Sequence, residues 1–410
     1  MLKKEFMENV GELIKSKDIR EDALMELDSH IEESKKEYLK SEKDEKIAEE
    51  KAVEQMGKIA EIAERFNKVH KGIFDWMLFA IVILLLSLGI LVANALQANN
   101  VIGNYTSEVI FIVVGLTIST FLIMCNYKKI ENYSKIIFGI AFATSIVSIY
   151  FKELAELYTL ILVLYIIAYS GIIYKNKFNI RTAFIAIWSL ISIIPLGKLN
   201  MFVLLVSYIC INLFQKKRKV HKKFIHIIFV VCAVIILGLV AFSSDYARIR
   251  LKAYSDSNLY STDNGWVHIK KAEILSMAKL IGELEYKIED YIGGLSNENI
   301  ITFITAKYGV LYSLALVLVV LLLLYRLILN TYKTKEQYGK NILIGTTAII
   351  SSQILLNILN GLNIIPYVYV KLPFITMDKI SLISSILIVS INISIYRRKD
   401  IVKINNEKPE

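Results

Sequence analysis

Long apolar runs, separated by short polar connections, fill most of the chain after residue 73. Most are close to the roughly 20 residues that a helix needs to cross a bilayer, and the third, fifth and sixth runs are short. The runs lie at 74–96, 107–126, 134–151, 154–174, 180–196, 199–214, 224–242, 303–329, 341–361 and 379–396. This pattern predicts an all-α fold, a polytopic membrane helix bundle of about ten spans.

Basic residues are concentrated in every second connection between these runs. The connection QKKRKVHKK at 215–223 is the clearest case, whereas QANNVIGNYTSE at 97–108 holds no Lys or Arg. Because Lys and Arg favour the cytoplasmic side of a membrane, both termini are predicted to be cytoplasmic, and the number of spans is then even. The predicted location is the cell membrane, which the chain crosses many times.

Composition supports a membrane protein and argues against other classes. Hydrophobic residues make up 55% of the 410 residues, and the formal net charge is +10. In a membrane protein this excess indicates anchoring at the cytoplasmic face, and no basic patch with base-stacking aromatics points to nucleic acid. Cys125, Cys210 and Cys232 lie inside apolar runs without CxxC spacing, so neither a disulfide framework nor a zinc site is indicated. We expect no metal and no cofactor.

The longest polar segment between apolar runs is the predicted loop 243–302. It has about 60 residues, and loops of this length are usually functional or disordered. The alternation of basic connections places it on the external side of the membrane. Apolar residues at spacings of three and four predict at least one amphipathic helix within it. These residues are Trp266, Ile269, Ile274, Leu275, Ala278, Leu280 and Ile281.

Residues 1–72 form a charged segment, which we predict to be a separate cytoplasmic helical domain. Its apolar positions recur at helical spacing, which predicts three or four short helices around a small core, with a break at Gly57. The stretches LMELDSHIEE and EEKAVEQMGKIAEIAERFNKVHK resemble the HAAS or permease-prefix domain. That resemblance implies a sensing or docking role toward an unknown cytoplasmic partner. The alternative is a solvated helical cap that binds no partner.

The C-terminal half carries a spaced set of polar, aromatic and proline residues. They are Gln353, Asn357, Pro366, the run Leu372-Pro373-Phe374-Ile375-Thr376 and, at the start of the predicted loop, Tyr246, Arg248 and Arg250. This set resembles the SEDS family (shape, elongation, division and sporulation), the RodA, FtsW and SpoVE type of polytopic membrane protein. The resemblance spans about residues 73–398, ahead of a cytoplasmic tail at 399–410. It implies the scaffold of a peptidoglycan glycosyltransferase, which joins lipid-linked disaccharide units.

The chain departs from that family where the chemistry is expected. The family's essential carboxylate stands directly before a Phe-Ile pair, and here Phe303 and Ile304 follow Thr302. A threonine hydroxyl cannot act as a general base toward a sugar hydroxyl, whereas an aspartate could. The family's Ser-Tyr-Gly-Gly segment is also replaced, by Thr-Met-Asp-Lys at 376–379. The scaffold is therefore expected to be kept and the catalytic centre to be lost.

Several residues are candidates for the remaining chemistry. Glu298 lies four residues before Thr302 and is the tentative replacement for the missing base. Arg248 and Arg250 are candidates for binding the diphosphate of a lipid-linked substrate, because guanidinium groups bind such anions bidentately. The other predicted substrate-binding residues are Lys270, Asn357 and Pro373. The alternatives are a solvated loop acid at Glu298, arginines that anchor lipid headgroups, and an interhelical hydrogen bond from the asparagine.

Three functions stay open at this point. The first is a divergent SEDS-like protein of cell-wall assembly, cell shape, division or sporulation, which binds lipid-linked peptidoglycan precursor or a synthase without the standard chemistry. The second is an active glycosyltransferase that uses Glu298 or another loop acid. The third is a lipid flippase or transporter. The expected partners are the precursor, membrane lipids and a penicillin-binding-type transpeptidase, and nucleic acid is not among them.

Overall fold

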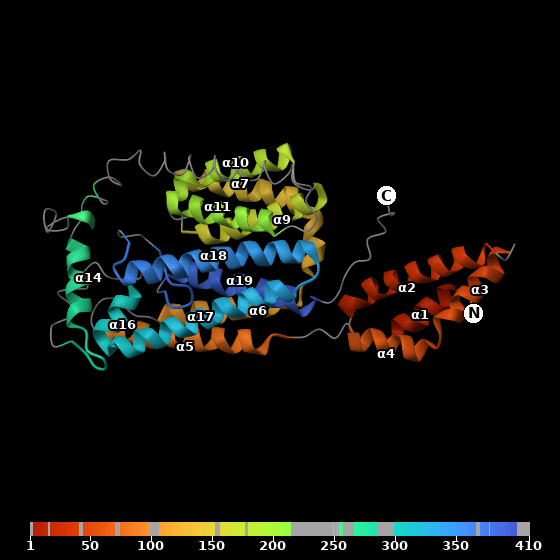
Figure 1. The fold of residues 1–410 in the computed structure, drawn as a ribbon, viewed down its shortest axis with the longest axis horizontal. Helices are drawn as coiled ribbons and strands as arrows, with labels where there is room; N and C mark the ends of the chain where they lie inside the picture. The colour runs from red at the N-terminus through yellow and green to blue at the C-terminus, as the bar shows by residue number, and fades with distance from the viewer. Residues whose placement is uncertain are drawn as a thin grey trace. The chain divides into compact units, whose positions relative to one another are not determined.

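A computed structural model describes the chain in twelve stretches and two single residues. They are 3–14, 17–40, 44–69, 74–98, 106–151, 156–176, 179–214, 249, 252, 254–256, 266–284, 299–365, 370–376 and 378–399. Within these ranges the regular secondary structure is helical and contains no strand (Figure 1), as predicted. The chain divides into two compact units. One comprises Met1–Phe74, Lys333–Glu336 and Ile395–Glu410, and the other Asp75–Tyr332 and Gln337–Ser394.

Four short helices make up the described N-terminal part of the first unit. They are α1 (Lys3–Leu13), α2 (Lys17–Tyr38), α3 (Glu45–Met56) and α4 (Ile59–Val69). Their apolar faces meet in a small core that includes Phe6, Val10 and Ile31. The predicted break at Gly57 is confirmed, because α3 ends there with a positive φ of 92°, which glycine adopts without strain.

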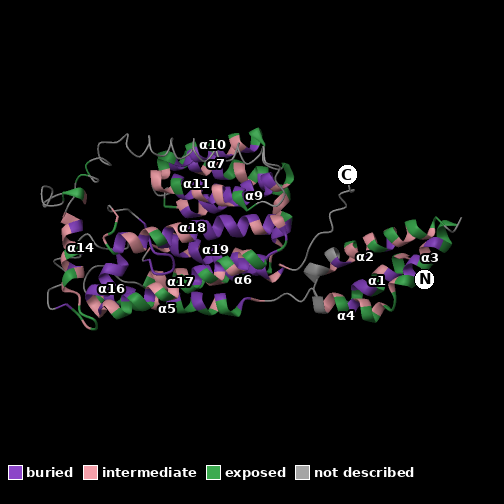
Figure 2. Ribbon diagram, in the orientation of Figure 1, coloured by how far each residue is buried: buried purple, intermediate pink, exposed green. Residues whose placement is uncertain are grey.

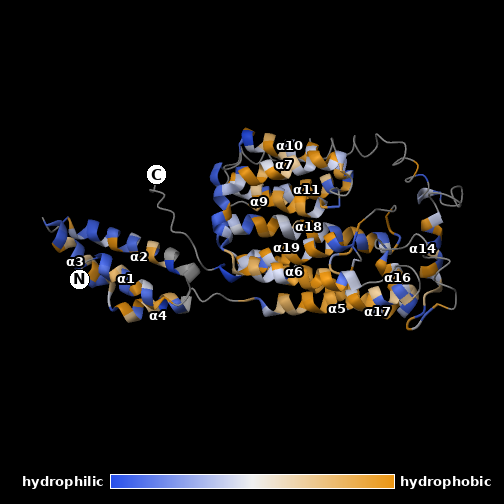
Figure 3. Ribbon diagram, turned by 180° about the vertical axis from the view of Figure 1, so that it is seen from behind, coloured by the Kyte–Doolittle hydropathy of each residue, from blue (hydrophilic) through white to orange (hydrophobic). Residues whose placement is uncertain are grey.

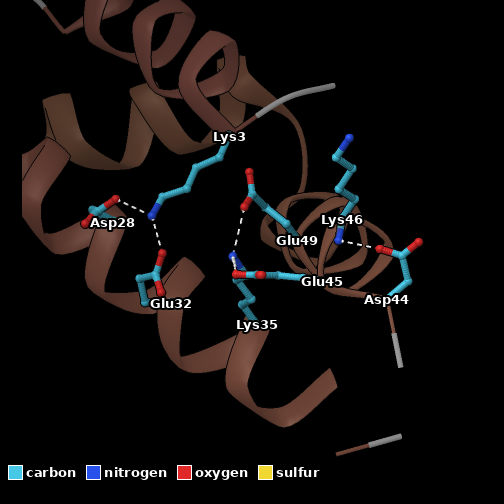
Figure 4. A network of polar contacts seen from close by, with 8 residues as sticks. All are labelled: Lys3, Asp28, Glu32, Lys35, Asp44, Glu45, Lys46 and Glu49. Carbon is cyan, nitrogen blue, oxygen red and sulfur yellow. Dashed lines mark hydrogen bonds and ion pairs between the residues drawn. The ribbon is translucent and has the colours of Figure 1, made fainter. Parts of the chain in front are cut away.

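Ion pairs tie α2 to its neighbours in this unit (Figure 4). Lys3 of α1 lies 2.7 Å from Asp28 and 2.5 Å from Glu32. Lys35 near the end of α2 lies 2.9 Å from Glu45 and 3.0 Å from Glu49 of α3. Hydrogen bonds to these two glutamates raise the pKa of Lys35 to about 12. Two lysines therefore supplement a core that is small for independent stability.

The second unit is a bundle of apolar helices (Figure 3). Seven of its described segments are long and apolar enough to cross a membrane: α5 (Trp76–Ala98), α6 (Thr106–Met124), η1 with α7 (Tyr127–Tyr150), α9 (Tyr158–Asn176), α17 (Val310–Lys333), α18 (Gln337–Gly361) and α19 (Lys379–Arg397). Two shorter apolar stretches are α10 with η2 (Ile180–Leu196) and α11 (Lys198–Leu213). These segments account for nine of the predicted runs, and the tenth, 224–242, lies outside the described residues. The protein is a multi-pass membrane protein.

One predicted span is wrong at its start. The run 303–329 contains two helices, α16 (Ile300–Tyr308) and α17, which are separated at Gly309 by a φ of 99°. The segment 279–284 runs beside the break and supplies its hydrogen bonds. Gly282 N–H donates to the carbonyl of Tyr308, and Val310 N–H donates to that of Lys279 (2.9 and 3.0 Å). The break is therefore a satisfied turn, although the surrounding sequence is largely apolar.

Helix α18 lies inside the bundle, and most of its residues are buried (Figure 2). Polar side chains within the bundle bond to one another across helices. The hydroxyl of Tyr165 lies 2.6 Å from that of Ser192, and the hydroxyl of Ser189 lies 2.9 Å from that of Tyr208. Such contacts satisfy polar groups that lipid cannot solvate. They also explain how apolar runs carry so many serines and tyrosines.

Candidate functional site

The candidate site is formed where the start of α16 meets the end of α18. Thr302 in the first turn of α16 is fully buried, and its hydroxyl donates to the carbonyl of Gly361 over 2.8 Å. Gly361 leaves room for this approach, since a Cβ there would lie 2.9 Å from the Cβ of Ile301. The two helices are thus packed closely at the position where the resemblance places an essential carboxylate.

The Thr302 bond has a chemical direction. A carbonyl oxygen only accepts hydrogen bonds, so the group at residue 302 has to donate. A threonine hydroxyl donates, whereas an ionised carboxylate can only accept. The end of α18 is therefore built around a donor at this position. The structure here suits threonine and not an ionised aspartate.

A lysine joins the predicted loop to both helices. Lys271 of α14 (Trp266–Met277) is fully buried, and its Nζ donates to the main-chain and side-chain oxygens of Asn360 over 3.0 and 2.9 Å. The side-chain amide of Asn360 donates in turn to Asn299, the residue before α16, over 3.3 Å. A cation at the C-terminal end of α18 is also favoured by the helix dipole. Three elements meet in this one polar cluster.

Neighbouring contacts dock α14 further on the end of α18. Nδ1 of His268 lies 2.8 Å from Oδ1 of Asn363, whose side-chain amide donates to the His268 carbonyl over 3.1 Å. Asn363 has a φ of 58°, a conformation that asparagine tolerates better than most residues. In both ribbon views α14 lies across the end of the bundle (Figures 1 and 3). The predicted loop thus contains an ordered helix that is fastened to the bundle by polar contacts.

The helix predicted within the loop is confirmed, but the prediction of an apolar buried face was incomplete. The helix ends at Met277, so Ala278, Leu280 and Ile281 lie beyond it. Its buried residues are His268, Lys271 and Ile274, at spacings of three. The side chains that dock the helix are thus mainly polar, and an apolar count cannot find them. The signal available in the sequence was the spacing of His268, Lys271 and Ile274, which recur at every third residue.

The 370–376 loop forms the other side of the region around α18. The side-chain amide of Asn357 donates to the carbonyl of Val370 over 2.8 Å. Phe374 has a φ of 68°, which is rare for a bulky residue. Gly89 of α5 packs against this residue, and a Cβ at Gly89 would lie only 2.7 Å from the Phe374 carbonyl. Lys371, near the start of the loop, pairs over 3.0 Å with Asp378, which follows the loop.

The predicted site residues are distributed unevenly. Thr302 and Asn357 border the end of α18, and Pro373 lies in the loop that Asn357 holds. Lys270 lies one residue from the buried Lys271 and pairs with Glu273 over 2.8 Å. Arg248, Arg250 and Glu298 lie outside the described residues, so their roles stay predictions. Among the residues with described positions, no cluster of His, Cys, Asp or Glu could hold a metal ion.

Solved structures share this fold. A chain from a peptidoglycan synthase complex, described as coordinating polymerization and crosslinking, is similar with a TM-score of 0.63 and 14% identity. The similarity covers 80% of this chain and 98% of that one. The rod shape determining protein RodA of Thermus thermophilus is similar with a TM-score of 0.55 and 14% identity, over 80% of this chain and 97% of RodA. A search of proteins with curated functions finds no match to the sequence.

Solved structures at 14% identity show a shared fold, whereas a match to a sequence profile shows the family. The sequence profile of the FtsW, RodA and SpoVE family, described as a cell cycle protein, matches residues 153–400. The matched part includes the short helix with Thr302, all of α18 and the 370–376 loop. It amounts to more than half of the chain. This protein therefore belongs to the FtsW/RodA/SpoVE family.

Proposed function

We propose that this protein is a non-polymerising member of its family, which binds lipid-linked peptidoglycan precursor during cell-wall assembly. The observation that carries the proposal is the hydrogen bond from Thr302 to Gly361. At the position where a catalytic carboxylate is expected, a hydroxyl stands instead, and this hydroxyl already donates to a carbonyl. The site then keeps its architecture without a base at this position.

The kinship of the chain supports the cell-wall part of the proposal. Its similar structures include a peptidoglycan synthase complex and a rod shape determining protein. Those names describe the relatives, and we extend the process to this chain because the matched region contains the candidate site. Polymerisation itself is not extended. A positioned general base typically contributes about 10²–10⁴-fold to a rate, so its loss would leave very weak turnover.

Precursor binding would use cationic and amide groups around the end of α18. We assign Lys271 a positioning role, because its ammonium group holds Asn360 and through it the start of α16. Arg248 and Arg250 remain the proposed partners of the diphosphate, since charge-assisted bidentate contacts are strong. Lys270, Asn357 and Pro373 remain proposed contributors. A lipid-linked disaccharide offers the matching groups, a diphosphate beside sugar hydroxyls.

The test uses the purified full-length protein and lipid-linked disaccharide-pentapeptide in two assays. The binding assay should show affinity that falls in Arg248→Ala and in Lys271→Met. Lys270→Met tests the proposed contribution of the neighbouring lysine, and we expect a smaller effect there. Ser276→Ala is the control on α14, because its side chain is exposed and bonds to Glu273 of the same helix. The polymerisation assay should show little or no product. Robust polymerisation that is abolished by Glu298→Gln would overturn the proposal and establish the enzyme alternative.

A transpeptidase of the penicillin-binding type is the second proposed partner. The support is the synthase complex among the similar structures, whose description couples polymerization to crosslinking. We propose that this chain associates with such an enzyme and supplies bound precursor. Co-purification of tagged full-length protein with the transpeptidases of the same cell tests this. Enrichment equal to that of an unrelated multi-pass protein would count against the association.

We also propose that residues 1–72 are a cytoplasmic docking domain of the HAAS type. Its four helices and ion-paired surface are the supporting observations. Deleting these residues should leave the membrane bundle folded and remove binding to a cytoplasmic partner. If the bundle itself collapses on deletion, the segment is a structural cap instead.

A further inference from the structure

A buried clamp fixes the beginning of α5. The carboxylate of Asp75 accepts bonds from Nε of Arg326 at 3.0 and 2.9 Å, and Arg326 Nη2 lies 2.8 Å from it. Asn330 donates to the same carboxylate over 2.7 Å. The carboxylate also accepts from Leu78 N–H in the first turn of α5 (3.1 Å). Helix α5 is thereby bonded at one end to two turns of α17.

A second contact lies on the same face of α5. Gly89 follows Asp75 by fourteen residues, which is about 21 Å along a helix and nearly four full turns. At that point α5 meets the backbone of Phe374, and the approach is so close that only glycine fits. The second contact therefore joins α5 directly to the 370–376 loop.

Away from these two contacts, α5 is not fully packed against its neighbour. A groove of about 530 Å³ separates the second half of α5 from α16 and α17. Leu88 and Val92 line it from α5, and Tyr308 and Leu316 line it from the other helices. The groove opens along one side of α5 only, because ten residues of the helix, Leu85 and Leu86 among them, are buried. The clamp and the Gly89 contact add a polar and a backbone contact that tie this packed helix to α17 and to the 370–376 loop.

We infer that Asp75 and Gly89 are positioning residues for the candidate site. The clamp at Asp75 sets the position of α5 along its axis. The close contact at Gly89 couples this position to the backbone of Phe374. Asn357 holds the same loop from α18, so the loop is fixed from two sides. The relevance of this arrangement to precursor binding rests on the proposed function. The proposed coupling between Asp75 and the 370–376 loop does not depend on that function.

The experiment measures hydrogen exchange of the 370–376 loop in the full-length protein. Asp75→Asn should speed exchange there by about tenfold, because a weaker clamp makes local opening easier. Gly89→Ala should perturb the same loop while the clamp is intact. Ser87→Ala is the matched control on α5. Its side chain is exposed and bonds only within its own helix, to Ile83, among the contacts described.

A double variant separates positioning from folding. Asp75→Asn leaves Arg326 without its carboxylate, which can destabilise the whole bundle. Asp75→Asn combined with Arg326→Leu removes both charges, and replacing a whole buried pair is often neutral for stability. We expect this double variant to unfold like the wild type and still to show fast exchange in the 370–376 loop. Wild-type exchange in both the double variant and Gly89→Ala would overturn the inference.

Precursor binding is measured on the same variants with lipid-linked disaccharide-pentapeptide as the probe. Binding by the wild type that weakens about tenfold with faster loop exchange would support the inference and the proposed function together. No binding by the wild type, with loop exchange that still responds to Asp75→Asn, would refute the proposed function alone. If the wild type binds the precursor but exchange of the 370–376 loop does not respond to changes at Asp75 and Gly89, only the inference is refuted.

Discussion

At the scale of single residues, the hydroxyl of Thr302 decides how the site is interpreted. It donates to the Gly361 carbonyl inside a fully buried contact. The resemblance predicts that a carboxylate is missing here, but the sequence could not predict what the threonine side chain bonds to. That partner comes from α18, more than fifty residues further along the chain.

Thr302→Asp should therefore destabilise the protein and not restore catalysis. An aspartate would place acceptor oxygens against the Gly361 carbonyl, and a buried group that loses its hydrogen bond costs about 1–3 kcal/mol. Thr302→Ser keeps the hydroxyl and is the matched control, with a much smaller loss. Thermal unfolding in detergent measures both, and polymerisation is assayed alongside. A stable, active aspartate variant would contradict this account.

The lysines of α14 show the same limit of prediction. Lys270 and Lys271 are adjacent in sequence but point about 100° apart on a helix, so only one of them can face the bundle. Periodicity of apolar residues did not fix which, because the buried stripe is itself partly polar. The structure buries Lys271 and leaves Lys270 paired with Glu273.

At the scale of elements, the predicted helices agree with the structure best where a run is bounded by polar residues. The division between α16 and α17 was missed because Gly309 stands between Tyr308 and Val310, inside a run that reads as one span. Neither side of the break carries a charge that would mark an end, apart from Lys307. The partner segment that satisfies the break belongs to the loop, and local sequence says nothing about it.

Gly309→Ala should lower stability by about 1–3 kcal/mol, the usual range for backbone strain of this kind. The residue has a φ of 99°, and a Cβ would lie 2.7 Å from the carbonyl of Leu280. Gly139→Ala is the control, because this glycine of α7 has no neighbour within 4 Å of a built Cβ. In a helix that substitution is neutral or favourable. Equal unfolding temperatures for the two variants would show that the break bears no strain.

The ion pairs of the N-terminal helices give a prediction at alkaline pH. The glutamates beside Lys35 raise its pKa from 10.5 to about 12. A raised pKa adds stability that is complete below pH 10.5 and is lost as the pH rises through 12. The unfolding temperature of the wild type, followed by helix content of the full-length protein, should therefore exceed that of Lys35→Met near neutral pH. The difference should shrink between these two pH values, and a constant difference would contradict the linkage.

At the scale of the whole molecule, charge placement predicts the orientation in the membrane. Charge placement predicts cytoplasmic reporters after Gly72, Lys219, Tyr332 and Lys399. It predicts external reporters near Asn100, Asn264 and Tyr369. Fusions at these positions, read by an enzyme active on one side only, check each connection separately. A cytoplasmic signal at Asn264 would show that the candidate site lies on the cytoplasmic side of the membrane instead.

The bond between Thr302 and Gly361 also has an evolutionary consequence. A carboxylate restored at position 302 alone would face a carbonyl that offers it no proton. Recovery of polymerase chemistry would need a second change that moves the end of α18 or provides a donor. The first of the two changes alone would leave a buried carbonyl without its hydrogen-bond donor, so the intermediate would be less stable. On the proposed function, this one hydrogen bond therefore opposes a return to polymerase chemistry by a single substitution.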